Sequence, residues 1–363
     1  MNESAGKNLL SPLTIRGVTL RNRIAVSPMC QYSAIDGMAN DWHLVHLGSR
    51  AVGGAGLVIV EATAVTPEGR ISPADMGLWD DWHVEPLARI ARCLTRMGAV
   101  PGIQLAHAGR KASTVPPFRG GGSLNREDGA WQTVAPSAIP FKDGYHVPRA
   151  MDKSEIAQLA TLFAAAGRRA VRAGFRIVEV HAAHGYLIHQ FLSPLSNHRT
   201  DEYGGSLENR MRLLLEMVTV LRNELPHDMP LFVRISSTDW HAGGWDLAQS
   251  VALARHLRLL GVDLIDASSG GLIPGVTIPL GPGYHVPFAS AIRKQTNILT
   301  GAVGLITEPL QANEIITSGK ADLVILAREM LREPYWALNA EQALVGESNW
   351  PPQYAWAVRR PKK

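Results

Sequence analysis

The sequence has 363 residues, of which 46% are hydrophobic, and its 36 basic and 32 acidic side chains give a formal charge of +4. Such a composition excludes a disordered chain, and the charge is too small and too dispersed for a nucleic-acid-binding surface. Two cysteines, Cys30 and Cys93, exclude a disulfide framework and a four-cysteine metal site. No apolar run approaches the roughly 18 residues of a membrane span, and the first ten residues lack a signal peptide's apolar stretch. We therefore expect a cytoplasmic protein without a membrane partner.

Taken in chain order, the sequence opens on a segment that alternates in polarity, 13–20, and its turn at Arg16-Gly17 predicts a hairpin. A short apolar run, a loop and an amphipathic helical stretch then recur about eight times. Runs so rich in Val, Ile and Leu predict parallel strands that are covered on both faces. The apolar runs are Ile24–Met29, Leu57–Ala62, Val100–Ala106, Ile177–His181, Leu231–Ile235, Leu264–Ala267, Ile298–Ala302 and Leu323–Ala327.

Between these runs, residues 152–174 and 206–225 have the apolar periodicity of helices. Eight strand–helix units in a row predict a (β/α)8 TIM barrel, with residues 1–363 forming one domain. A doubly wound sheet is the alternative, but the Gly-x-Gly-x-x-Gly turn that it needs is absent after the first run. The third unit carries a long loop excursion, residues 109–149, on the side of the barrel where sites are built.

The polar side chains at the ends of the predicted strands are the candidate site residues, and His181, His184 and Tyr186 form the strongest group. Two imidazoles three residues apart can direct two donors at one oxygen. A phenol with a pKa near 10 is suited to giving a proton at neutral pH. Structural histidines that cap a loop are the alternative, and a metal site is a weaker one because a third ligand is missing.

Two polar residues interrupt apolar strands, and a glycine-rich turn follows a third. Arg234 lies within Leu-Phe-Val-Arg-Ile and needs an anionic partner, which is either an internal carboxylate or a ligand. Gln104 offers donors and an acceptor that suit the edge of a heterocycle. The segment 301–304 and Arg328 end the last two strands, where barrels commonly bind phosphate. The pattern predicts a phosphorylated ligand across the barrel mouth.

In these blocks the chain resembles the old yellow enzyme family of flavin oxidoreductases over residues 10–356, nearly its whole length. The most telling blocks are Asn22-Arg23-Ile24, Ser27-Pro28-Met29-Cys30-Gln31-Tyr32, Asp41-Trp42-His43, Glu61 to Val65, Pro67-Glu68-Gly69-Arg70, His107-Ala108-Gly109-Arg110-Lys111, His181 to Leu187, Leu192-Ser193-Pro194 and Asn197 to Ser206. The resemblance implies non-covalent FMN, NADPH or NADH as reductant, and an activated alkene as substrate. It also makes a homodimer or homotetramer the expected assembly.

The resemblance also implies a role for each site residue. Tyr186 would deliver a proton, His181 and His184 would bind the substrate carbonyl oxygen, and Tyr32 would line the substrate pocket. Cys30 would lie near N5 of the flavin and tune its redox behaviour. The cofactor-binding residues would be Ser27, Pro28, Met29, Cys30, Ala62, Gln104, Arg234, Ala302, Val303, Gly304, Ala327 and Arg328.

Two positions depart from the family pattern. Ala327 replaces the usual glycine beside the phosphate, where its methyl group would crowd the backbone and weaken FMN binding. Trp356 stands where short members carry an arginine that reaches a neighbouring subunit, so we do not expect that arginine contact in its usual form, and an aromatic lid is the alternative.

There are four alternatives to alkene reduction. An NADPH oxidase and a nitro or xenobiotic reductase would use the same site. The dienoyl-CoA reductase or amine dehydrogenase type would need an iron–sulfur cluster, which two cysteines cannot hold. A flavin carrier without turnover would not need the proton donor Tyr186.

Overall fold

The computed structural model, which describes residues 6–358, contains a closed barrel of eight parallel strands. The predicted TIM barrel is therefore confirmed. Its strands, in their order around the barrel, are β10 (Leu264–Ser268), β11 (Leu299–Ala302), β12 (Leu323–Leu326), β3 (Ile24–Val26), β4 (Leu57–Ala64), β5 (Val100–Ala106), β8 (Ile177–Ala182) and β9 (Leu231–Ser236).

All eight predicted runs contain a barrel strand, and the differences lie at their ends. The largest correction is at the first run, 24–29, where the strand ends at Val26. The Ser27 amide still donates to Leu326 O, but Pro28 has no N–H to continue the ladder. The segment from Ser27 onward is thereby released from the sheet and continues as a loop to Asn40.

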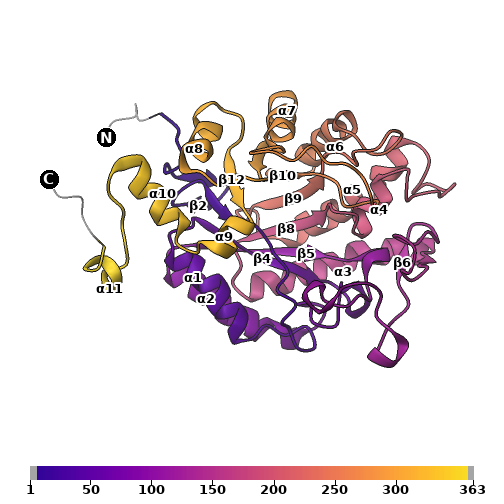
Figure 1. Ribbon diagram of the computed structural model, residues 1–363. Coiled ribbons are helices and arrows are strands. Elements are labelled where there is room, and N and C mark those ends of the chain that lie inside the picture. Colours follow the sequence, from indigo (N-terminus) through magenta and orange to yellow (C-terminus); the bar gives the residue numbers. More distant parts are fainter. Residues whose placement is uncertain (1–5, 359–363) are drawn as a thin grey trace.

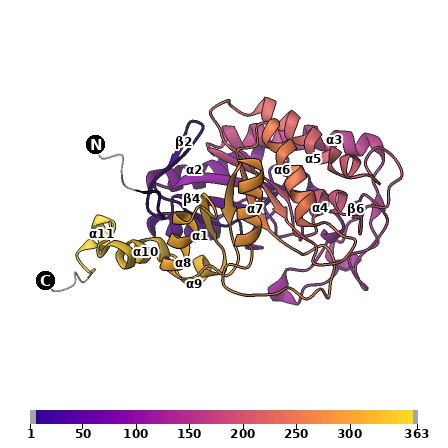
Figure 2. The ribbon, with the colours of Figure 1, turned by 90° about the horizontal axis from the view of Figure 1, so that it is seen from above.

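Helices cover the outside of the barrel, as Figures 1 and 2 show from two directions. Both predicted helices are confirmed, and the residues just before them cap their N-termini: Asp152 accepts from the Glu155 amide and Ser206 from the Asn209 amide. The helices that follow the strands are α1 (Asp41–Val52), α2 (Val84–Arg96), α3 (Lys153–Arg172), α5 (Leu207–Glu224), α6 (Leu247–Leu259), α7 (Val286–Thr296) and α8 (Pro309–Thr317).

The predicted N-terminal hairpin is present, and it closes the floor of the barrel. Strands β1 (Leu13–Ile15) and β2 (Val18–Leu20) pair antiparallel. Their buried side chains join a core cluster with inward-facing residues of the barrel strands, among them Leu57, Phe232 and Leu264. The lower half of the barrel is therefore filled with apolar side chains, which leaves the opposite end for a site.

The excursion after β5 forms a wall beside the barrel mouth. Within it, β6 (Val134–Ala135) and β7 (Arg149–Ala150) make a small parallel pair. A second feature of this end is the short helix α4 (Leu187–Leu192), which follows β8 directly and which the sequence did not predict. All six of its residues are buried, so it lacks the polar face by which a surface helix is recognised.

The C-terminal helices extend away from the barrel. After β12 the chain forms α9 (Arg328–Arg332), α10 (Trp336–Val345) and α11 (Pro352–Ala355), and α11 stands apart from the barrel in both views (Figures 1 and 2). Trp356, just beyond α11, is 86% exposed. Throughout residues 6–358, no helix combines the length and the apolar character that a membrane crossing demands.

Candidate active site

Three predicted side chains meet where β8 ends. The ring centroid of His181 lies 5.2 Å from that of His184 and 5.0 Å from that of Tyr186, with edge-to-face orientations in both pairs. His181 ends its inward-facing row on β8, and the other two residues follow on the turn to α4. The structure thus brings together the group that the sequence singled out.

Hydrogen bonds fix the orientation of the two imidazole rings. His181 Nδ1 accepts from the Ala183 amide at 3.3 Å, so this ring carries its proton on Nε2. His184 Nε2 lies 2.7 Å from Ser268 Oγ at the end of β10, which leaves Nδ1 for another partner. Burial, aided by the charge of Arg234, holds the pKa of both rings well below the usual range. Both are therefore neutral at pH 7, and each can donate one hydrogen bond.

Tyr186 has the surroundings of a phenol that keeps its proton. Burial, together with Cys30, Tyr32 and other acidic groups, raises its pKa well above the ordinary value. The Lys111 ammonium lies 5.0 Å from the centre of its ring, and it donates to the carbonyl oxygens of His184 (2.9 Å) and Gly271 (3.0 Å). Lys111 therefore links the turn after β8 to the loop after β10.

A layer of polar side chains lies inside the barrel between the apolar floor and this cluster. Gln104 donates to Glu179 Oε1 at 2.8 Å, and Arg234 Nε lies 3.1 Å from Asp266 Oδ2. Arg234 also donates to Ser27 Oγ at 3.0 Å. The internal carboxylate that the sequence left open as the partner of Arg234 is therefore Asp266.

The polar layer holds two carboxyl groups and one guanidinium. Burial, reinforced by Asp266, raises the pKa of Glu179 to about 8, and burial also raises the pKa of Asp266. Because Arg234 balances a single negative charge, one carboxyl group keeps its proton at neutral pH. Among the described residues, Glu179 Oε2 and Asp266 Oδ1 lack a hydrogen-bond partner, and Asp266 Oδ2 meets Arg234 Nε as an ion pair without hydrogen-bond geometry.

The predicted cofactor- and substrate-binding residues that follow β3, between Ser27 and Tyr32, border the polar layer. Ser27 is buried, and Pro28, Met29, Cys30 and Tyr32 are partly exposed, as residues lining a ligand would be. Burial, with Asp75 and Glu61, raises the pKa of the Cys30 thiol well above its usual range. Tyr32 contacts Phe118 of the excursion edge to face, at 6.3 Å between ring centroids. Ala62 lies where a bulge interrupts the pairing of β4 with β5.

The predicted phosphate-binding residues lie at the ends of β11 and β12. Ala302 and Val303 are buried, and Gly304 has φ +104°. A side chain at Gly304 would lie 2.8 Å from His285 Nδ1, so only glycine fits. Ala327 precedes α9, whose first residue, Arg328, is exposed. Backbone amides and one cation are thus available here.

Comparison with known proteins identifies the relatives of this site. The family model for the NADH:flavin oxidoreductase / NADH oxidase family matches residues 8–347. An NADPH dehydrogenase of Geobacillus sp. (strain WCH70) is 52% identical over 93% of this chain and 94% of its own length. The chain belongs to the old yellow enzyme family. It is therefore an enzyme, an oxidoreductase of a flavoprotein family.

Further relatives of this old yellow enzyme agree in sequence and in fold. An NADPH dehydrogenase of Bacillus subtilis (strain 168) is 46% identical over 96% of this chain and 98% of its own. The solved structure of morphinone reductase matches with a TM-score of 0.77 at 27% identity, covering 97% of this chain and 93% of that one. Histamine dehydrogenase from Rhizobium sp. 4-9 matches with a TM-score of 0.79 at 27% identity, but this chain spans only 48% of it.

The residues of this old yellow enzyme fit a flavin. The side-chain NH2 group of Gln104 donates to Glu179. Its side-chain oxygen accepts no hydrogen bond from another side chain among the described residues, so it is available to a ligand. Beside it, Arg234 provides the positive charge that a reduced flavin ring needs. Gly304, where His285 leaves no room for a side chain, follows β11 in the region where barrels commonly bind phosphate.

Sequence reasoning missed several residues that support the site. Glu179 and Asp266 interrupt apolar strands just as Arg234 does, so their signal was present in the sequence. Lys111 ends the motif that begins at His107, but no local pattern shows that it reaches the turn after β8. The buried pair of His189 and Asp239, described below, is separated by fifty positions and has no signature in either segment.

Proposed function

We propose that the protein is an FMN-dependent ene-reductase that uses NAD(P)H to reduce an activated alkene, an α,β-unsaturated carbonyl compound. Bound FMN, held by Gln104, Arg234 and Ser27, would supply the hydride chemistry that links NAD(P)H to the β-carbon of the alkene. The observation that carries the proposal is the cluster of His181, His184 and Tyr186 above the polar layer. A carrier without turnover needs no such cluster.

In this proposal the two neutral imidazoles bind the carbonyl oxygen of the substrate. They donate from two directions, His181 through Nε2, and their hydrogen bonds strengthen as negative charge grows on that oxygen. One such donor typically contributes about 3–4 kcal/mol to the stability of the transition state. Tyr186, which keeps its proton, then delivers it to the α-carbon and completes the addition.

The proposed cofactor and reductant rest on the same residues and on the relatives. Gln104, Arg234 and Ser27 would hold the ring system, and the turn at Gly304 with Arg328 would hold the phosphate. The similar bacterial proteins are NADPH dehydrogenases, which supports NADPH as the reductant. Supernatant from heat-denatured protein should contain FMN, whereas FAD or no flavin in a protein that cannot be reconstituted would contradict the proposal.

Steady-state kinetics with NADPH and 2-cyclohexenone under anaerobic conditions test the activity. We expect alkene-dependent NADPH oxidation and formation of cyclohexanone. Parallel reactions with NADPH alone in air and with a nitroaromatic compound measure the alternative oxidase and nitroreductase activities. Turnover in only these parallel reactions would exclude alkene reduction.

Tyr186→Phe separates the two half-reactions of the proposed cycle. Hydride transfer from NADPH needs no proton donor, so stopped-flow rates of that half should stay close to wild type. Alkene reduction needs the phenol proton, and its rate should fall by about a hundredfold to ten-thousandfold, the usual contribution of general acid catalysis. Equal slowing of both half-reactions, or of neither, would show that Tyr186 is not the proton donor.

A further inference from the structure

The turn that carries two of the proposed substrate-binding groups, residues 184–186, has an unusual backbone. His184 has φ +58° and Gly185 has φ +74°, and a left-handed conformation is unfavourable for histidine. Side chains hold the amides of this turn: the His184 N–H donates to Ser236 Oγ at 2.9 Å, and the Gly185 N–H donates to His189 Nδ1 at 2.9 Å. The conformation of the turn therefore depends on groups outside it.

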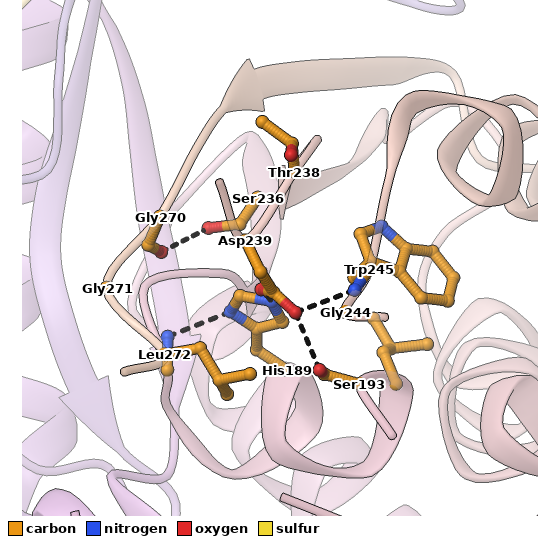
Figure 3. A network of polar contacts seen from close by, with 12 residues as sticks. His189, Ser193, Ser236, Thr238, Asp239, Gly244, Trp245, Gly270, Gly271 and Leu272 are labelled. Carbon is orange, nitrogen blue, oxygen red and sulfur yellow. Dashed lines mark hydrogen bonds and ion pairs between the residues drawn. The ribbon is translucent and has the colours of Figure 1, made fainter. Parts of the chain in front are cut away.

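His189 is one half of a fully buried pair. Its Nε2 lies 2.9 Å from Asp239 Oδ1, and neither side chain is exposed (Figure 3). The second oxygen of Asp239 accepts from Ser193 Oγ at 2.6 Å and from the Trp245 amide at 2.7 Å. Since His189 lies in α4 and Asp239 follows β9, the pair connects two neighbouring units of the barrel.

The hydrogen bonds around His189 determine which nitrogen carries the proton. A proton on Nδ1 would face the Gly185 N–H, so the ring must carry its proton on Nε2, where it faces Asp239. Burial opposes ionisation of Asp239, but its contacts with His189, Ser193 and Trp245 outweigh burial and lower the pKa below the usual value. Asp239 is therefore a carboxylate, and its charge 2.9 Å from His189 Nε2 favours the tautomer that can hold Gly185.

The turn has little room to compensate for a lost hydrogen bond. A side chain at Gly185 would lie 2.1 Å from the Gly271 carbonyl oxygen, and one at Gly271 would lie 2.7 Å from the His184 Cα. These two glycines place the loops after β8 and β10 in direct backbone contact. A shift of Gly185 consequently moves its neighbours His184 and Tyr186 relative to the loop that carries Ser268.

We propose that His189 and Asp239 are positioning residues of the active site. Asp239 fixes the tautomer of His189, that tautomer holds the Gly185 amide, and the held turn directs His184 and Tyr186 toward the substrate. The inference rests on the proposed function, because the groups that are positioned are those assigned to the carbonyl and the proton. A pair that served stability alone would not affect substrate geometry while the fold stays intact.

Asp239→Asn tests the tautomer with almost no change of shape. The oxygen that accepts from the Trp245 N–H must remain an oxygen, so the new amide N–H2 faces His189. The ring would then have to move its proton to Nδ1, against the Gly185 N–H. Ser193→Ala is the matched control, because it removes a hydrogen bond from the same carboxylate and leaves the tautomer unchanged.

The affinity of the holoenzyme for para-hydroxybenzaldehyde, a phenol that would occupy the carbonyl position, is the first measurement. We expect Asp239→Asn to weaken it and to slow alkene reduction, each by about tenfold to a hundredfold, as small misplacements of catalytic groups do. The FMN dissociation constant should stay close to wild type. Ser193→Ala should change the phenol affinity and the rate by less than about threefold. Equal effects of the two variants would overturn the inference.

His189→Asn provides a rescue. Its side-chain oxygen takes the place of Nδ1 and can accept from the Gly185 N–H, and an amide has no alternative tautomer to adopt. The further change Asp239→Asn should therefore weaken phenol binding only slightly in that background. The double variant should therefore bind the phenol more tightly than Asp239→Asn alone. If the double variant binds no better than Asp239→Asn, tautomer control is wrong, even where Asp239→Asn itself is too unstable to purify.

Hydrogen exchange separates this inference from the proposed function. Exchange of the Gly185 amide should accelerate in Asp239→Asn and not in Ser193→Ala, whatever the enzyme reduces. A wild-type protein that neither binds the phenol nor reduces 2-cyclohexenone would contradict the proposed function. Unchanged exchange at Gly185 in Asp239→Asn would contradict the positioning role.

Discussion

The interior of the barrel has two layers of opposite character, built by the same strands. The lower layer is apolar and the upper layer is polar, and only two positions along a strand separate them, the spacing that keeps side chains on one face. On three neighbouring strands the inward side chain changes from Ile177 to Glu179, from Phe232 to Arg234 and from Leu264 to Asp266.

The difference shows how one barrel combines stability with chemistry. The lower layer, sealed by the hairpin, buries apolar area and needs no partner to be stable. The upper layer buries two carboxyl groups against one guanidinium, which stabilises little by itself, because the loss of hydration offsets much of the attraction. A cluster so arranged is expected where a ligand is bound, and substitutions in the two layers should therefore have opposite consequences.

Phe232→Ala should have the largest effect on stability. The ring is fully buried in the lower layer, and its removal should lower the free energy of unfolding by about 3–5 kcal/mol. Below the unfolding transition, FMN affinity should stay within about threefold of wild type, because no cofactor-binding side chain is altered. Chemical denaturation and quenching of flavin fluorescence measure the two quantities. Strong loss of FMN affinity in folded protein would show that the layers are not separate.

Arg234→Met, two positions further along the same strand, should have the complementary effect. It leaves Asp266 without its cation, and it removes the positive charge that we propose to lie next to the flavin ring. We expect FMN affinity to fall by about thirtyfold or more, corresponding to the roughly 2–5 kcal/mol that loss of one partner of a buried charge pair costs. Arg234→Lys, which keeps the charge, should retain part of the affinity. The same titration checks both variants, and stoichiometric FMN in purified Arg234→Met would contradict the assignment.

Glu179→Gln should have a smaller effect that depends on pH. A folded-state pKa of about 8, above the unfolded value, means that the native protein binds a proton that the unfolded chain releases as pH rises above about 4.5. The stability contributed by this proton is complete at low pH and is lost as pH approaches 8. The variant does not titrate, so its unfolding midpoint relative to wild type should increase from pH 5 to pH 8. A constant difference across that range would show that Glu179 is ionised throughout.

Most of the fold could be predicted from sequence because its signals are local. Parallel strands buried on both faces give continuous apolar runs, and all eight were found. Two elements were misjudged because the local signal fails there. The predicted first strand was extended to Met29, although Pro28 cannot continue the ladder and the strand ends at Val26. Helix α4 is too short and too completely buried to show periodicity.

The site could be predicted less completely, for a different reason. Residues at strand ends, such as His181 and Tyr186, were found because the barrel brings all those ends to one face. Supporting contacts between distant segments were not found, since neither His189 nor Asp239 shows its partner in the surrounding sequence. Asp266 could have been found, because an acidic residue in the apolar run Leu-Ile-Asp-Ala-Ser requires the same explanation as Arg234.

Cys30→Ala should have the smallest effect. It tests whether Cys30, at the rim of the polar layer, takes part in the reaction or only modulates the flavin. Burial, with Asp75 and Glu61, keeps the thiol protonated, and a thiol is a far weaker nucleophile than a thiolate. Transfer of hydride and a proton needs no covalent bond to the protein, so turnover should stay within about tenfold to a hundredfold of wild type. The flavin reduction potential should shift if Cys30 lies beside the ring as proposed, because the substitution removes a polarisable group. Spectroelectrochemical titration and steady-state kinetics measure the two effects. Complete loss of turnover with FMN still bound would require a direct chemical role for Cys30, whereas an unchanged potential would place the side chain away from the ring.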